Sequence, residues 1–320
     1  MQTLEQSAAL PTSIPEQPLS AADIDQVPRL DIATFSSRYF RRRRPVLITD
    51  MATQWPACQR WSFDFFATLD PARAVTLEQG NVLQGETAFE SAPLGEYLSG
   101  LASDASPAPE TTPTSAPTTA PFTPLAPPAA DAGPRYLSMF RVFEQFPRLR
   151  GDVDFSLLEA MTLRQVYFAW LGPAGTLTGY HIDWIDNILA QISGRKRVWL
   201  VPPSASRAMY PSRKYDYRST LSEVEPSTWD AARHPLFADV RPTEITLEPG
   251  QMLFIPHGWW HRVESLSPSI SINAFGHDLS GLLLRQSRAS MLRLLHRLGL
   301  HGRGDCTCHQ PNTKRTRPAG

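Results

Sequence analysis

Several features are scarce in this 320-residue sequence, and each scarcity argues against a class of protein. The three cysteines, Cys58, Cys306 and Cys308, are few and odd in number, so they do not form a disulfide framework. This scarcity favours a reducing compartment. No apolar run approaches the ~18 residues of a membrane span. The first residues lack the basic start and apolar centre of a secretory signal peptide, so we expect a cytoplasmic protein.

Net charge is also lacking. Lys+Arg and Asp+Glu both number 31, and this balance predicts neither a nucleic-acid partner nor a membrane partner. The run Arg41–Arg44 is a local exception, which we interpret as a solvated run of charge at a helix end. Lysine is rare: Lys196, Lys214 and Lys314 stand against 28 arginines.

A proline-rich segment interrupts the chain. Residues 103–134 hold nine prolines among Ala, Thr and Ser, so we predict a disordered insertion there. A proline-motif ligand for a partner protein is the weaker alternative for this segment. Residues 1–27 are predicted to be a flexible leader. Residues 301–320 are predicted to be a disordered tail, because the CTCH stretch Cys306–His309 has too few ligands for a closed zinc site.

The remaining residues are predicted to be ordered. Residues 28–102 form the N-terminal part of the domain, with a strand over Pro45–Asp50 and helices over Trp61–Leu69, capped by Ser62, and Leu94–Leu101. Residues 281–300 form a leucine-rich amphipathic helix. Its apolar stripe is expected to pack on the rest of the chain or on a second copy in a homodimer.

Residues 135–280 form the predicted core. From Val166 to Phe275, one strand-like run follows another, separated by turn signals such as Gly172-Pro173, Ser193-Gly194 and Pro249-Gly250. Helices long enough for repeated crossovers are lacking, so a parallel α/β sheet is excluded. The pattern predicts a mainly β fold, either a sandwich or a barrel.

The stretch TGYHIDW, Thr178–Trp184, places polar groups inside a strand-like run. His181 and Asp183 point to one side because strand side chains alternate. Continued through HIDWIDNILAQI, this side also carries Asn187 and Gln191, whereas the other side is more apolar except for Asp186. We therefore expect the His181 side to line a polar cavity, although a buried His–Asp hydrogen-bonded pair is the simpler alternative.

A second segment, EPGQMLFIPHGWWHRVESL, strengthens the first interpretation. A Pro-Gly turn opens a strand, Pro256 ends it, and His261 starts the next strand. Two histidines and one carboxylate on neighbouring strands form a facial triad, which suits mononuclear non-haem Fe(II) and leaves coordination positions open.

The segments TGYHIDWIDNILAQISGRKRVWLVPP and PGQMLFIPHGWWHRVESL resemble the JmjC, or cupin-like, family of Fe(II)- and 2-oxoglutarate-dependent oxygenases. They are most similar to the asparaginyl hydroxylase of hypoxia-inducible factor and its bacterial cupin-like relatives. The N-terminal RRPVLITD and WPACQRWS also resemble that family. The resemblance implies a double-stranded β-helix, a cupin or jelly-roll core, with flanking N- and C-terminal helices.

The resemblance also implies the metal ligands. His181, Asp183 and His261 would hold Fe(II). His257 is a competing ligand, but it directly follows Pro256, where the strand should break. We expect His234 and His277 to be surface or loop residues, and Trp259 and Trp260 to pack in the barrel.

A cosubstrate site is implied as well. Lys196 would bind the distal carboxylate of 2-oxoglutarate, because a lysine supplies a compact charge on a thin stem. Thr178 would donate a hydroxyl to the same carboxylate, provided that a bulge at Gly179 turns it toward the His181 side. Asn187, Tyr136 and Asn273 match further cosubstrate positions. An aromatic residue commonly follows the last of these directly, whereas here Ala274 intervenes before Phe275.

We therefore expect an oxygenase that uses Fe(II), 2-oxoglutarate and O₂ to hydroxylate a C–H bond of a protein side chain or an amino-acid-like substrate. Two alternatives stay open at this point: a non-catalytic metal-binding cupin that acts as a sensor or regulator, and a zinc cupin enzyme, since zinc also takes three protein ligands and water.

Overall fold

The structure is a computed structural model in which residues 24–80, 88–103, 133–216, 219–302 and 306 are described. Most of the predicted leader, the proline-rich insertion and the predicted tail lie outside the described residues, and so does Cys308. The predicted boundaries differ at two places. Asp25–Val27, at the end of the predicted leader, forms a strand, and Cys306, in the predicted tail, is buried and forms a backbone bridge with Tyr215.

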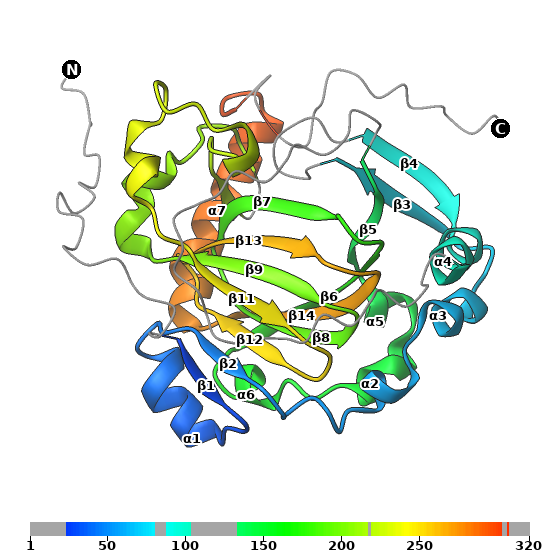
Figure 1. The fold of residues 1–320 in the computed structure, drawn as a ribbon. Helices are drawn as coiled ribbons and strands as arrows, with labels where there is room; N and C mark the ends of the chain where they lie inside the picture. Colours follow the sequence, from blue (N-terminus) through cyan, green and yellow to red (C-terminus); the bar gives the residue numbers. More distant parts are fainter. Residues whose placement is uncertain (1–23, 81–87, 104–132, 217–218, 303–305, 307–320) are drawn as a thin grey trace, which may run out of the picture.

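Two sheets face each other and form the body of the domain (Figure 1). The strands of the larger sheet are, in order, β1 (Asp25–Val27), β2 (Val46–Ile48), β12 (Met252–Ile255), β8 (Asp186–Ser193), β14 (Ser269–His277), β6 (Arg164–Gly172), β5 (Arg135–Phe140), β3 (Ala74–Gln79) and β4 (Ala88–Pro93). Those of the smaller sheet are β10 (Ser219–Leu221), β7 (Leu177–Asp183), β13 (Trp260–Ser265), β9 (Lys196–Val201) and β11 (Thr243–Leu247). Neighbours are antiparallel except for β1 and β2. The expected mainly β, cupin-like fold is confirmed.

Helices flank the sheets. They are α1 (Ile32–Thr34), which continues as a π-helix over Phe35–Phe40, then α2 (Pro56–Arg60), α3 (Phe63–Leu69), α4 (Leu94–Ser103), α5 (Val142–Gln145), α6 (Ser156–Glu159) and α7 (Ser287–Arg297), which follows a π-helix over Gly281–Gln286. Short 3₁₀ helices span Pro147–Asp152, Pro203–Met209, Pro226–Thr228 and Pro235–Asp239. Ser62 caps α3 as predicted, because its hydroxyl accepts the Phe65 N–H at 3.0 Å.

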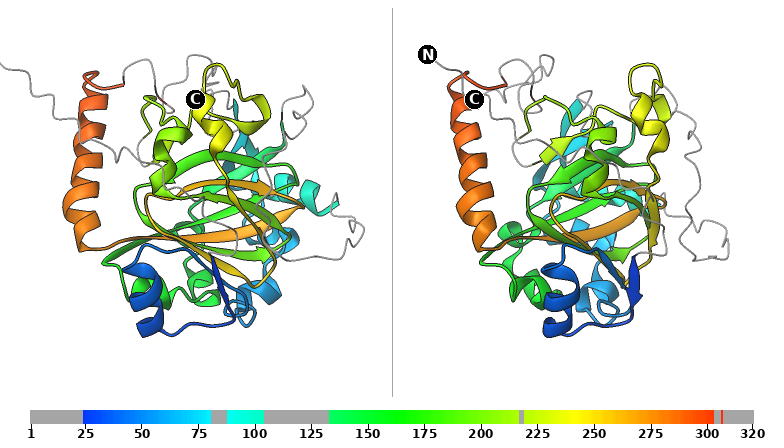
Figure 2. Two further views of the ribbon diagram at one scale, coloured as in Figure 1. Left: turned by 60° about the vertical axis from the view of Figure 1, so that its left-hand side comes forward. Right: turned by 90° about the vertical axis from the view of Figure 1, so that its left-hand side faces the viewer.

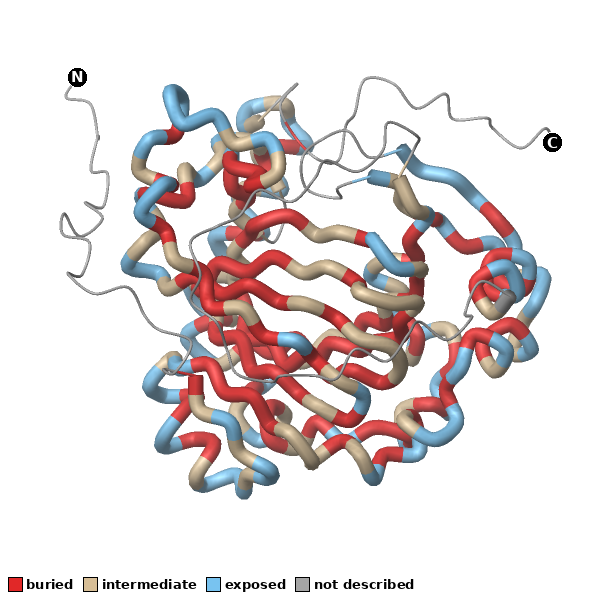
Figure 3. Tube along the Cα trace, in the orientation of Figure 1, coloured by how far each residue is buried: buried red, intermediate tan, exposed pale blue. Residues whose placement is uncertain are grey.

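The apolar side chains of the sheets divide between two cores. Ile188, Ala190 and Ile272 point away from the smaller sheet and pack with the N-terminal helices in the largest core. A second core, which includes Leu189 and Val198, fills one end of the space between the sheets. Figure 3 shows the buried residues concentrated along the strands. Polar residues take the place of this second core at the other end, which leaves room for a cavity.

The run HIDWIDNILAQI is two strands rather than one. β7 ends at Asp183 in the smaller sheet, and β8 begins at Asp186 in the larger sheet. The two-residue corner Trp184-Ile185 carries the chain from one sheet to the other and preserves the alternation. As a result, His181, Asp183 and Asn187 still line one cavity, although they lie on two sheets.

Two expectations about exposure, for Arg43 and His277, were wrong, and the expectation that His234 lies at the surface or in a loop holds for the loop alone. Arg43 is not part of a solvated run, because it pairs with the fully buried Asp186 at 2.8 Å. His234 and His277 are buried instead of lying at the surface, at 6% and 8% exposure. His277 is the last residue of β14, and His234 lies in the loop before the 3₁₀ helix at Pro235.

The C-terminal helix runs along one side of the domain (Figure 2). Ala289 and His296 are buried on its inner side, and the His296 ring stacks on Tyr215 with 4.2 Å between ring centroids. The apolar stripe predicted from the sequence lies on the outer side: Leu283, Leu284, Met291, Leu294 and Leu298 are 55–71% exposed. This stripe does not pack on the barrel. Within the described residues, none of the helices is both long and apolar enough to cross a bilayer.

We propose that a second copy of the chain covers this stripe. Leu284, Met291 and Leu298 recur every seven residues, the spacing with which a helix packs along an identical helix. We expect light scattering after size exclusion to give twice 35.7 kDa for the wild type. The double variant Leu284→Arg, Leu298→Arg should give the mass of a single chain, because it places charges in the interface. Ile32→Arg on α1, the control, should give the wild-type mass. A monomeric wild type would rule the proposal out.

Candidate metal centre

The register between β7 and β13 brings two histidines together. His181 and His261 are directly opposite each other in this antiparallel pair, and their ring centroids are 4.0 Å apart. Side chains of directly opposed residues project from the same face of a sheet. Both histidines therefore point into the space between the two sheets, from segments that are 80 positions apart in the sequence.

A bulge in β7 extends this alignment. Val263 opposes Thr178, so two steps along β13 match three steps along β7. The extra residue falls at Gly179-Tyr180, where the sequence predicted that a bulge would reorient Thr178. Thr178 consequently lines the same cavity as His181, which simple alternation would not allow.

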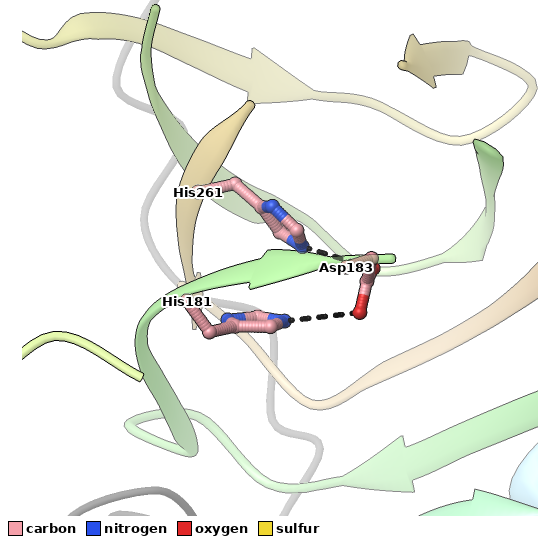
Figure 4. Close-up of side chains that lie close together, drawn as sticks. All are labelled: His181, Asp183 and His261. Atoms are coloured by element: carbon pink, nitrogen blue, oxygen red, sulfur yellow. Dashed lines mark ion pairs between the residues drawn. The ribbon is translucent and has the colours of Figure 1, made fainter. Parts of the chain in front are cut away.

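Asp183 completes a three-residue cluster (Figure 4). Its Oδ1 lies 3.8 Å from Nε2 of His181, and its Oδ2 lies 3.4 Å from Nε2 of His261. One ligand atom from each residue lies within 4.8 Å of the others, and this is the cluster of metal-ligating side chains found among the described residues. The predicted ligands thus converge.

Backbone carbonyls orient both imidazoles. Nδ1 of His181 lies 2.9 Å from the Gly179 carbonyl oxygen, and Nδ1 of His261 lies 3.1 Å from that of Trp259. A carbonyl oxygen only accepts, so Nδ1 carries the proton in each ring and donates it. Each Nε2 then presents its lone pair toward Asp183. This is the tautomer and orientation that a metal-bound histidine requires.

The charge states also suit a cation. Burial, followed by the neighbouring His261, lowers the pKa of His181 to about 4, so this ring is neutral near pH 7. Burial raises the pKa of Asp183, but the neighbouring rings of His261 and His181 and the Asn187 amide bring it below its usual value. A neutral imidazole and an ionised carboxylate are the forms that bind a metal.

Two asparagines support the carboxylate. Asn273 Nδ2 donates to Asn187 Oδ1 at 2.7 Å, and Asn187 Nδ2 donates to Asp183 Oδ2 at 3.5 Å. Both asparagines are buried and line the cavity. They therefore form a chain of amides from β14 through β8 to the carboxylate of Asp183 on β7.

Lys196 lies at another part of the same cavity. It is 2% exposed, and Nζ donates to Tyr136 Oη at 2.8 Å and to Ser271 Oγ at 2.7 Å. Burial lowers the pKa of Lys196 to about 7. A buried amine between two hydroxyls can bind a carboxylate strongly, because that anion would restore its charge and share the hydroxyl donors.

The cavity has a volume of about 250 Å³ and is lined by all eight site residues predicted from the sequence: Tyr136, Thr178, His181, Asp183, Asn187, Lys196, His261 and Asn273. Sequence reasoning missed Ser271, which is two residues before Asn273 on the same face of β14. Alternation along that strand could have found it. Phe275, whose displaced position left the substrate side undefined, follows the same alternation and also lines the cavity.

Acidic and aromatic side chains that the sequence did not single out complete the wall. The acids are Glu78 and Asp216, and the aromatic residues are Phe89, Phe168, Trp170 and Phe275. Burial raises the pKa of Glu78. Its Oε2 and the indole N–H of Trp170 are buried and have no hydrogen-bond partner among the described residues. Such groups are costly to bury unless a ligand or water satisfies them.

The competing candidates lie elsewhere. His257 turns its Nδ1 to Asp186, at 3.1 Å, and does not line the cavity. Trp259 and Trp260 are buried in two different apolar cores, as expected for packing residues. The donor set in the cavity is thus two imidazoles and one carboxylate. This set fits Fe(II) with open positions, and the buried Lys196 lines the same cavity.

Comparison with known proteins gives a family match and several named relatives. A sequence profile of the family described as "Cupin-like domain" matches residues 32–278. "Jumonji C domain-containing protein 5" of Drosophila melanogaster is 27% identical over 279 residues, which are 83% of this chain and 63% of that protein. "Lysine-specific demethylase JMJ30" of Arabidopsis thaliana is 28% identical over 269 residues, 81% of this chain and 56% of that protein.

A third relative matches a shorter region. "HSPB1-associated protein 1" of Rattus norvegicus is 41% identical over 109 residues, which are 33% of this chain and 23% of that protein. The chain spans about half to three-fifths of the length of the first two relatives. The profile match nevertheless covers most of the chain, including the strands that carry the candidate metal ligands, and so the chain belongs to the JmjC, or cupin-like, family.

Proposed function

We propose that this protein is an Fe(II)- and 2-oxoglutarate-dependent oxygenase that hydroxylates a C–H bond of a protein side chain or an amino-acid-like substrate. The convergence of His181, Asp183 and His261 in one cavity with the buried Lys196 is the observation that carries the proposal. When bound, Fe(II) and 2-oxoglutarate would supply the oxidising chemistry: R–H, O₂ and 2-oxoglutarate give R–OH, succinate and CO₂.

The residues of the chain would divide the work. His181 and His261 would each supply a ring nitrogen and Asp183 a carboxylate to hold the metal, and three protein ligands would leave positions free for the cosubstrate and O₂. Lys196, with the hydroxyls of Tyr136 and Ser271, would hold the distal carboxylate of the cosubstrate. The aromatic wall excludes water from the reacting carbon. Holding the metal, the cosubstrate and the substrate carbon in fixed relative positions would raise the reaction rate, because the reacting groups are already oriented.

The charged side chains of the cavity wall that neither the metal nor the cosubstrate would use favour a cationic substrate. Once Lys196 pairs with the cosubstrate, the remaining charged side chains of the described cavity wall, apart from the triad, are Glu78 and Asp216. Aromatic rings beside them, including Trp170, can contact a cation through their faces. Two of the relatives are named lysine-specific demethylases, and lysine is a cationic side chain. Demethylation of a methylated amine also begins with hydroxylation of a C–H bond, so both outcomes use the same site.

We expect Asp183→Ala to abolish succinate formation from 2-oxoglutarate, because it removes the only anionic ligand of the triad. Purified variants would be compared after anaerobic loading with Fe(II), with bound metal measured in parallel. Asp64→Ala, an exposed acid on α3, should behave like the wild type. Turnover by the Asp183 variant at the wild-type rate would defeat the assignment, and zinc as the metal retained by the native protein would favour a zinc cupin.

The affinity for 2-oxoglutarate should depend on pH through Lys196. Its pKa is about 7 in the free protein, and a bound carboxylate raises it, so binding above pH 7 takes up a proton. Calorimetry should therefore show affinity that is constant below about pH 7 and falls by up to about tenfold per unit above it. Lys196→Met should bind roughly 10–100-fold more weakly, without this slope.

Lys214→Met is the matched control for this titration, since it removes the other lysine within the described part of the chain. It should retain both the affinity and the slope. An unchanged slope in Lys196→Met would assign the titration to another group and would remove Lys196 from the cosubstrate site.

Substrate charge can be tested with peptide pools that differ only in net charge, read by the mass gain of one oxygen atom. We expect hits among lysine- and arginine-containing peptides. Glu78→Gln and Asp216→Asn should each lower kcat/KM for these hits by roughly 10-fold, because each removes an anion that a buried cation would pair with. Turnover of 2-oxoglutarate without substrate should persist in both variants. Preference for acidic peptides would contradict the assignment.

A further inference from the structure

Asp186 is a fully buried carboxylate that belongs neither to the triad nor to the cavity wall. It begins β8, three residues after Asp183. Arg43 Nη1 donates to both of its oxygens at 2.8 Å, and His257 donates its backbone N–H at 3.0 Å and contributes Nδ1 at 3.1 Å. Breaking a buried pair of this kind leaves an uncompensated charge. The buried charge of Asp186 is therefore stabilised by three donor groups, which are Nη1 of Arg43 and the backbone N–H and Nδ1 of His257.

Both partners of Asp186, Arg43 and His257, are connected to His261 through the turn that precedes it. His257 lies in the turn Pro256–Trp259, directly before β13. The carbonyl of Arg43 accepts the indole N–H of Trp259 at 2.9 Å. The carbonyl of Trp259, in turn, accepts Nδ1–H of His261. Asp186 and Arg43 thus hold both sides of the turn whose last carbonyl orients the imidazole.

The same cluster reaches Asp183. Gly258 donates its N–H to the Asp183 carbonyl at 3.3 Å. On the other side, Arg43 Nη2 pairs with Asp278 at 3.1 Å, and Asp278 pairs with Arg285 at 2.8 Å. Arg285 then donates to the Trp184 carbonyl, one residue after Asp183, at 3.0 Å. The contacts of this cluster end on backbone that directly flanks the metal ligands.

We propose that Asp186 and Arg43 form a positioning pair that sets the orientation of His261 and Asp183 and so determines how tightly the centre retains its metal. The pair does not touch the metal. This inference rests on the proposed metal centre, and it adds two residues that are not among the proposed metal ligands.

Asp186→Asn is the first test, because it keeps the shape and removes the charge. We expect Co(II) to bind roughly 10–100-fold more weakly, as for the loss of a residue that orients a ligand. In the metal-free protein, long-range ¹H–¹⁵N NMR should show that the His261 ring loses its single Nδ1–H tautomer. His181 should keep its own, since its carbonyl partner is Gly179 on β7.

Glu225→Gln is the matched control. It breaks a comparable buried pair, Glu225 with Arg262 at 3.1 Å, in which the side chains are 5% and 4% exposed. Arg262 follows His261 on β13, and its side chain projects from the opposite face of the strand, away from the space between the sheets. We expect Glu225→Gln to lower the melting temperature while leaving Co(II) affinity and both tautomers at wild-type values.

Arg43→Lys guards against a variant that fails to fold. Lysine keeps the charge but lacks the planar fork with which Nη1 reaches Asp186 and Nη2 reaches Asp278, so Co(II) affinity should fall by a few-fold while the protein stays folded. Equal loss of affinity in Asp186→Asn and Glu225→Gln, or an unchanged His261 tautomer in Asp186→Asn, would overturn the proposal. If the wild type binds no Co(II) but Asp186→Asn still changes the tautomer of His261, the metal centre is wrong and the positioning of His261 stands.

Discussion

The site depends on the pairing of β7 with β13. Because His181 and His261 are opposite each other in this ladder, the hydrogen bonds of the sheet alone set the distance between the two imidazoles. The carbonyls that fix their tautomers lie two residues before each histidine, on Gly179 and Trp259. Strand pairing therefore defines the position of the two imidazoles, and the carboxylate of Asp183 is supported from the other sheet through Asn187.

The sequence was sufficient for the parts of the site that follow local rules. Alternation placed His181, Asp183 and Asn187 on one side. The chain changes sheets between Asp183 and Asn187, but the corner has two residues and so preserves the two-residue alternation of the strands. The resemblance added His261 and Lys196, which no local rule connects to β7. Thr178 required both: alternation placed it on the wrong side, and the glycine after it indicated how the strand corrects this.

The remaining features could not be predicted because they depend on contacts distant in sequence. Glu78 reaches the cavity from β3, a strand of the N-terminal part of the domain, and nothing in its neighbours marks it. Arg43 looked like one of four exposed arginines, whereas its partner Asp186 lies 143 positions away. Asp186 itself broke the apolar side of its strand, and this exception was the one local sign of a buried pair. Buried charges stand out in a sequence only when the pattern around them is regular.

The bulge at Gly179-Tyr180 divides β7 into two halves that are out of phase. On the C-terminal half, odd-numbered residues face the cavity; on the N-terminal half, even-numbered Thr178 does. Deletion of Gly179 or Tyr180 would restore regular pairing and keep Thr178 opposite Val263 on the cavity side, because Thr178 would then lie two residues before His181. A strand of the full length without the bulge would instead turn Leu177 toward the cavity, so the metal ligands would stay in place while the cavity wall would lose the hydroxyl of Thr178.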